Sequence, residues 1–192
     1  MYFMIISIMV ISLVGTISHF LYDISNHNKV VGLFGSVNES TWEHIKIALT
    51  PTLLWGLVDG FIFGANVNYF LAKVSSVLVI ILLIPILFYG YKKIVKKDLF
   101  VVDIVIFYIA IICSQLLFNF LLGVSPVNFI ICYLSCVGAF VVFGCYMLLT
   151  LLPLRNFIFK DPLTNRYGFR AHSGLFCLRK KKKDNGKHKR IS

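Results

Sequence analysis

Five long apolar runs follow one another along this 192-residue chain. They cover residues 1–22, 47–64, 74–91, 99–122 and 127–153. A helix needs about 20 predominantly apolar residues to cross roughly 30 Å of hydrocarbon, and each run approaches or exceeds that length. Only 14% of the residues are charged, against about 25% in a typical soluble domain. The sequence therefore predicts an all-α, polytopic transmembrane helix bundle with five crossings, placed in the cell membrane.

The distribution of positive charge predicts how this bundle is oriented. Of the 19 Lys and Arg residues, 12 lie in residues 155–192. Two crossings separate them from a second basic cluster, KKIVKK at residues 92–97, so both clusters fall on one side of the membrane. The positive-inside rule makes that side cytoplasmic. We therefore expect residues 23–46 and the C-terminus in the cytoplasm and the N-terminus outside; an inside N-terminus, with one crossing miscounted, is the alternative.

The two ends of the chain differ in character. No basic residue precedes the first run and no small-residue cleavage site follows it, which argues against a cleaved signal peptide. Residues 1–168 form the predicted helix-bundle domain, and residues 169–192 a basic, disordered cytoplasmic tail. The unbroken Lys180 to Lys183 should attract anionic lipid headgroups, at about 1 kcal/mol per basic residue. The tail lacks interleaved aromatic residues for base stacking, so no nucleic-acid partner is expected.

The stretch SVNESTWEHIK, residues 36–46, gathers an unusual number of polar residues. Ser40 and Glu43 have the spacing of a capping box, in which the serine oxygen accepts from the N–H of residue 43 and the glutamate binds the N–H of residue 40. This pattern predicts a helix that starts at Ser40. Trp42 suits the membrane interface, where amphipathic rings gather. On this interpretation, the stretch only positions the second transmembrane helix at the cytoplasmic boundary.

A second interpretation treats the same stretch as part of a binding site. Glu39, Glu43 and His44 lie within about one helical turn, and His19 and Asp23 share one face at the end of the first crossing because they are four residues apart. Together they could bind a solute, a lipid headgroup or a metal ion, because nitrogen and oxygen ligands suit zinc, manganese or iron. The candidate metal ligands are His19, Glu39, Glu43 and His44. No H-E-x-x-H or comparable signature supports a metal, and the sequence identifies no cofactor.

Three short runs carry a resemblance to a known family. They are SHFLYD at the end of the first crossing, VNESTWEHIK after it, and KDPLTNRYG after the last. The chain resembles a family of small bacterial integral membrane proteins of unknown function, in which N-E-S-x-W-E-H follows the first helix and D-P-x-T-x-x-Y-G the last. The resemblance covers roughly residues 1–168. It implies the fold and the membrane location, but no activity, and no role for the tail, because such proteins end near Gly168.

The run KDPLTNRYG itself predicts a turn after the last crossing. Asp-Pro opens turns, and Asn165 and Gly168 tolerate left-handed backbone. We expect the run to fold back against the cytoplasmic face and to cover the polar cluster. Asp161 and Tyr167 are therefore further candidate site residues.

The second crossing carries a carboxylate beside a ridge of small residues. Gly56, Gly60 and Gly64 recur every fourth residue, which permits close helix packing; packing within the chain is favoured over packing against a second copy. Asp59 lies about 18 Å along the helix from Ile47 at 1.5 Å per residue, and so near mid-membrane. There a carboxylate costs several kcal/mol unless it is protonated or paired.

Asp59 has two interpretations that the sequence leaves open. In the first, a protonated Asp59 is bonded to Gln115 or Asn119 of the fourth crossing. In the second, Asp59 takes part in ion or proton passage. Asp103, near the cytoplasmic end of the fourth crossing, is expected to be merely interfacial.

Two classes of function remain. The favoured one is a non-enzymatic membrane protein, such as a carrier, ion-handling protein or partner subunit, whose polar cluster binds a solute, an ion or a lipid headgroup. The alternative is a membrane-embedded hydrolase or transferase that acts on lipid, with Glu39 or Glu43 as base and optionally a metal held by histidines. No phosphate loop, dinucleotide fingerprint or G-x-S-x-G elbow is present. Beyond the lipid bilayer, a homo-oligomer or a membrane partner protein is left open.

Overall fold

The computed structural model describes residues 2–96 and 99–171. The elements are α1 (Tyr2–Ile24), the short 3-10 helix η1 (Val31–Leu33), α2 (Thr41–Phe63), α3 (Tyr69–Val95), α4 (Phe100–Gly123) and α5 (Phe129–Leu151). Each of the five α-helices is long and apolar enough to cross a membrane. The predicted all-α bundle with five crossings is confirmed.

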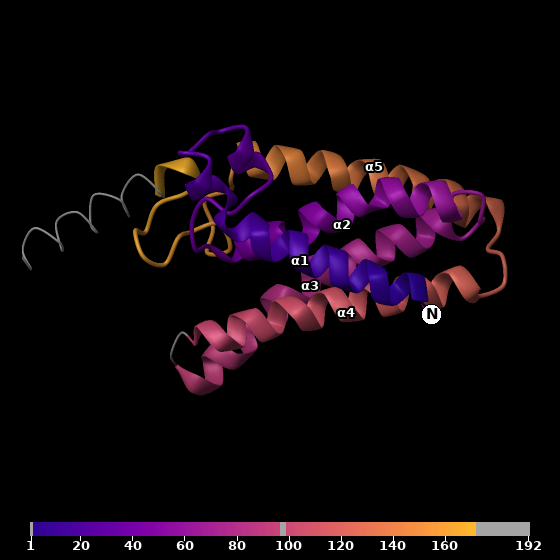
Figure 1. The fold of residues 1–192 in the computed structure, drawn as a ribbon, viewed down its shortest axis with the longest axis horizontal. Helices are drawn as coiled ribbons and strands as arrows, with labels where there is room; N and C mark the ends of the chain where they lie inside the picture. Colours follow the sequence, from indigo (N-terminus) through magenta and orange to yellow (C-terminus); the bar gives the residue numbers. More distant parts are fainter. Residues whose placement is uncertain (1, 97–98, 172–192) are drawn as a thin grey trace, which may run out of the picture.

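The five helices run alongside one another, so that their connections gather at two ends (Figure 1). One end, called the loop end here, holds residues 25–40, the end of α3 with the start of α4, and residues 152–171. The far end holds the start of α1 and the α2–α3 and α4–α5 connections. The basic cluster at the end of α3 and the segment after α5 thus share one end, as their separation by two crossings requires.

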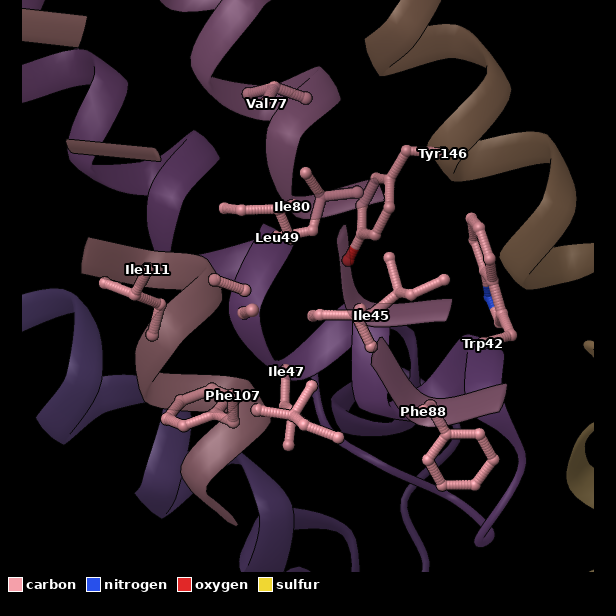
Figure 2. Close-up of a cluster of buried hydrophobic side chains, with 14 of the residues drawn as sticks. Trp42, Ile45, Ile47, Leu49, Val77, Ile80, Phe88, Phe107, Ile111 and Tyr146 are labelled. Atoms are coloured by element: carbon pink, nitrogen blue, oxygen red, sulfur yellow. The ribbon is translucent and has the colours of Figure 1, made fainter. Parts of the chain in front are cut away.

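The hydrophobic core lies where α2, α3 and α4 meet, with Tyr146 added from α5 (Figure 2), Ile11 from α1 and Phe159 from the segment after α5. Leu49 and Ile80 are fully buried there, and the Tyr146 ring enters from α5.

Lipid chains are as apolar as the helices, so the hydrophobic effect does not hold helices together in a membrane. Close packing does, and small residues permit it. A Cβ atom at Gly15 of α1 would lie 2.6 Å from the carbonyl oxygen of Ile47. Only glycine therefore allows α1 to approach α2 so closely.

The predicted glycine ridge packs inside this chain. A Cβ atom at Gly56 would lie 2.9 Å from Cε of Lys73, and one at Gly60 would lie 3.1 Å from Oη of Tyr69. Gly56 and Gly60 thus face α3, as favoured from the sequence, whereas the atoms nearest to a Cβ atom at Gly64 belong to Gly60. What Gly56 and Gly60 meet there is a pair of polar side chains rather than an apolar surface.

Both α2 and α3 begin before the apolar runs within them, although the start of α2 agrees with the helix start predicted at Ser40. α2 begins at Thr41 and α3 at Tyr69, whereas the runs started at residues 47 and 74. Both added segments carry charged residues that the fold buries, which hydropathy alone assigns to loops. Residues 172–192, which hold nearly all of the predicted basic tail, lie outside the described residues, so the tail and its boundary at residue 168 stay predictions.

Candidate functional site

The start of α2 lies where the sequence predicted, but the predicted capping box is wrong. Ser40 is the N-cap residue, yet its side chain makes no capping hydrogen bond. Its backbone N–H donates to Oδ1 of Asn38 at 2.8 Å, not to Glu43. The Glu43 carboxylate instead accepts from the N–H of Val37 at 2.9 Å and pairs with Nζ of Lys46 at 2.6 Å.

Lys46 explains why Glu43 turns away from the cap. Its side chain is fully buried, and Nζ also donates to the carbonyl oxygen of Gly32 at 2.9 Å. A buried ammonium requires a counterion, and removing one partner of a buried pair costs about 3–5 kcal/mol. Glu43 therefore fixes the loop against α2 and is not free for a ligand. The three-residue spacing of Glu43 and Lys46 was the signal that sequence reasoning missed.

The segment after α5 folds back over the start of α2, as predicted. The N–H of Trp42 donates to the carbonyl oxygen of Ile158 at 3.0 Å, and the Trp42 ring stacks on Phe159 with ring centroids 4.9 Å apart. Nδ2 of Asn38 donates to the carbonyl oxygen of Gly168 at 3.1 Å. The two longer runs that carry the family resemblance are therefore in direct contact.

Asp161 and Tyr167 belong to this contact between segments. The Asp161 carboxylate is fully buried and accepts from the N–H groups of Glu39 at 3.2 Å and Thr164 at 2.8 Å. Tyr167 packs against the main hydrophobic core. Both residues hold the C-terminal segment in place, because their described contacts are to the neighbouring backbone and the core.

His19 and His44 are the candidate residues that the fold brings together. Their ring centroids lie 6.3 Å apart. Both line a pocket of about 190 Å³, called the α1/α4 pocket here, which has walls from α1 and α4 and a floor from α2. Its lining is mostly apolar, with Ile47 and Phe107 buried at its base.

The α1/α4 pocket opens on the outer surface of the bundle. Its lining includes the exposed side chains of Thr16, Phe20, Ile104 and Tyr108. In a membrane-spanning bundle, this surface faces lipid. The pocket thus combines an opening toward the bilayer with polar groups near the loop end.

The polar groups of this pocket have a defined hydrogen-bonding character. Nδ1 of His44 lies 3.0 Å from the carbonyl oxygen of Ser40. A carbonyl only accepts, so Nδ1 carries the proton and Nε2 of the neutral ring is an acceptor. Asp103, expected to be merely interfacial, also lines the pocket, with Oδ1 accepting from Oη of Tyr91 at 2.8 Å. The sequence did contain a signal for this position: Asp103 lies at the start of the fourth crossing, which begins on the same side of the membrane as His44.

The four candidate metal ligands do not come together as a set. Within residues 2–96 and 99–171, no group of three or more His, Cys, Asp and Glu side chains is arranged to hold a metal ion. Glu43 is paired with Lys46, and Glu39 is half-buried. Asp23 is exposed, and its Oδ1 atom lies 3.4 Å from Nε2 of His27. The histidines and the carboxylate that line the α1/α4 pocket are therefore His19, His44 and Asp103, and Glu39 lies near enough to His19 to interact with it electrostatically.

Asp59 is buried at the far end of the bundle, and its predicted partners are wrong. Oδ2 pairs with Nζ of Lys73 at 2.8 Å, and Oδ1 is 2.8 Å from Oη of Tyr69. The Asn119 side chain donates instead to its own helix, at the carbonyl oxygen of Gln115. Asp59 also lies only four residues, about 6 Å, before the end of α2, and so nearer the far end than mid-membrane.

A second pocket lies between α2 and α5. It encloses about 320 Å³, and its polar groups are the hydroxyls of Thr50 and Tyr146. These lie 2.7 Å apart, and the tyrosine also donates to the carbonyl oxygen of Leu33. The hydroxyls are thus already engaged with the protein, which makes this pocket the weaker candidate.

Comparisons with known proteins agree with the resemblance seen in the sequence. A family model described as a family of unknown function (DUF6512) matches residues 1–169. No curated protein and no solved structure matches the chain. The matched range includes all five helices and the two motif runs that meet at the loop end. The chain therefore belongs to DUF6512, a family of unknown function.

Proposed function

We propose that this multi-pass membrane protein binds a lipid in the α1/α4 pocket, without transforming it. The observation that carries the proposal is the pocket itself, which opens on the lipid-facing surface and places two imidazoles and a carboxylate beside apolar walls. A ligand that enters from the side of the bilayer meets His19, His44 and Asp103 with its polar end. This is the lipid-headgroup form of the non-enzymatic function favoured from the sequence.

The size of the pocket indicates how much of the lipid it takes. At about 190 Å³ it is smaller than the roughly 300–1,000 Å³ of pockets for drug-sized ligands. It has room for a small headgroup and a short length of chain. The remaining chain then stays in the bilayer, against the exposed Phe20 and Ile104 at the opening.

The acceptors in the pocket define the chemical class of the headgroup. In the neutral ring with its proton on Nδ1, Nε2 of His44 is an acceptor, and the oxygens of the Asp103 carboxylate are acceptors too. A headgroup with hydroxyl or ammonium donors is complementary to them. A phosphate-terminated headgroup would place its acceptor oxygens against the acceptors of the pocket, and its negative charge against the carboxylate of Asp103.

The charge distribution supports an orientation for this site. With the basic cluster at residues 92–97 and the C-terminus in the cytoplasm, as the positive-inside rule favours, the pocket opens into the inner leaflet of the cell membrane. The tail at residues 169–192 then lies where anionic headgroups attract it.

Binding of fluorescent lipids to the purified protein in detergent tests the proposal. The probes are diacylglycerol, with a hydroxyl donor, phosphatidylethanolamine, with an ammonium donor, and phosphatidic acid. We expect at least one of the first two to bind more tightly than phosphatidic acid. Asp103→Asn should weaken that binding by about tenfold or more, because hydrogen bonds to charged groups contribute about 1.5–3 kcal/mol.

A matched pair of variants at the surface of α4 locates the site. Ile104 and Ile109 are both 40% exposed, but only Ile104 lines the α1/α4 pocket. Ile104→Trp should block the opening and weaken binding at least about tenfold, or ~1.4 kcal/mol, whereas Ile109→Trp should bind like the parent. Equal binding by both variants would rule out this pocket as the site.

A further inference from the structure

The segment that follows α5 leaves large apolar side chains uncovered at the loop end. Leu152, Leu154 and Phe157 are 67%, 53% and 67% exposed. The two residues after Phe157 face the opposite way, because Ile158 packs against the hydrophobic core and Phe159 is buried. Single exposed apolar residues are common, but a group of them indicates an interaction surface.

Backbone hydrogen bonds fix the direction in which these side chains point. The carbonyl oxygen of Ile158 accepts from the N–H of Trp42 in α2 at 3.0 Å. Within the segment, the N–H of Asn156 donates to the carbonyl oxygen of Leu154, and Oδ1 of Asn156 accepts from the N–H of Ile158, each at 3.0 Å. The segment is therefore folded against α2, and Phe157 points outward from a fixed backbone.

Two helices place Phe157 at the boundary of the membrane. Its ring centroid lies 5.3 Å from that of Tyr89. Tyr89 stands about 20 residues into α3, which begins at Tyr69, or about 30 Å at 1.5 Å per residue, which is the thickness of the hydrocarbon core. Oη of Tyr89 also lies 2.8 Å from Oγ1 of Thr41, the first residue of α2. Both helices thus place Phe157 where the acyl chains meet the headgroups.

Positive charge accompanies the exposed apolar side chains. Arg155 and Lys160 are both exposed, and residues 152–160 contain no acidic residue. At the membrane surface, basic side chains are attracted to anionic lipid, and a guanidinium binds phosphate through paired hydrogen bonds. The segment thus combines apolar groups at the depth of the acyl chains with cations that match the charge of an anionic headgroup.

We propose that residues 152–160 form an interfacial anchor that binds anionic phospholipid at the loop-end surface of the membrane. Phe157 and the two leucines insert among the upper parts of the acyl chains, and Arg155 and Lys160 bind lipid phosphates. Because the same segment covers the start of α2, anionic lipid stabilises the closed loop end. The anchor shares no residue with the lining of the α1/α4 pocket, so either site can fail while the other holds.

A spin label at residue 157 tests the depth of the anchor. Phe157→Cys is labelled in a background without the native cysteines and placed in nanodiscs that contain phosphatidylglycerol. We expect the label to be accessible to oxygen, which partitions into hydrocarbon, and protected from a water-soluble nickel chelate. Asn165→Cys, at an exposed residue of the same segment, is the control and should show the reverse. Equal exposure of both labels to the chelate would overturn the proposal and indicate a protein partner instead.

A matched pair of charge variants tests the lipid class. Phosphatidylglycerol added to the parent protein in detergent should raise its melting temperature more than phosphatidylcholine does. Arg155→Gln/Lys160→Gln should lose most of this rise. Lys93→Gln/Lys96→Gln, which removes the same charge from exposed positions at the end of α3, should keep it. A parent without the rise, or an equal loss in both double variants, would overturn the proposal.

Discussion

Glu43 and His44 are neighbours in the sequence, but the fold uses them in different ways. Glu43 binds the buried Lys46 and a loop N–H, and so belongs to the scaffold. His44 bonds to its own helix through Nδ1 and lines the α1/α4 pocket. In an apolar chain, the role of a polar side chain therefore depends on which donor or acceptor the fold places beside it.

Glu43→Gln should strongly destabilise the protein. A capping box would tolerate this change, because glutamine also closes one. Lys46, however, would keep a buried charge without a counterion, at about 3–5 kcal/mol. Thermal unfolding in detergent measures the difference. Glu39→Gln is the control, because the described hydrogen bond of Glu39 uses its backbone N–H; equal melting of the two variants would contradict the structural role of Glu43.

At the scale of elements, α2, the helix that bears most of the buried charged residues, is also the most enclosed helix. Of the most apolar stretch of each helix, 50% is buried within the protein in α2, against 6% in α5. α2 carries Glu43 and Lys46 near its start and Asp59 near its end. Charged side chains within a membrane span must face protein, so these residues require α2 to be central. α5 has no such residue and lies at the edge.

Gly60→Leu should separate α2 from α3. Even a Cβ atom at Gly60 would lie 3.1 Å from Oη of Tyr69, so a larger side chain must displace the tyrosine and its contact with Asp59. Val58→Leu is the matched control on the same helix, because Val58 is 40% exposed. We expect a lower melting temperature for Gly60→Leu alone. If both variants melt like the parent, the ridge does not pack as described.

At the scale of the whole molecule, orientation in the membrane is a prediction from charge. Cysteines introduced at Lys96 and Arg155, in a background without the native cysteines, should not react with an impermeant reagent added to intact cells. Both lie at the loop end, which the positive-inside rule places in the cytoplasm. Ala65→Cys, in the α2–α3 connection at the far end, should react. The opposite labelling pattern would establish the inverted topology.

The bundle was predictable because an apolar run of sufficient length has few other structures available to it. The contact between the two motif runs was predictable in outline, since Asp-Pro opens a turn beside the membrane. The partners of Asp59 were not, because Lys73 and Tyr69 come from a helical turn that hydropathy assigned to a loop. Asp103 was missed for a related reason: its contact with the pocket depends on the rotation of α4 about its axis.

The contact between Asn38 and Gly168 has a consequence for biogenesis. The two residues are separated by 130 positions along the chain. At about 5–20 residues per second, the ribosome makes the later residue roughly 6–26 s after the earlier one. During that interval, the segment after α5 does not yet cover the start of α2, and the Trp42 ring has no Phe159 ring to stack on. Insertion and completion of the fold are thus separate events: the helices can enter one after another, but the loop end closes only after the fifth has emerged.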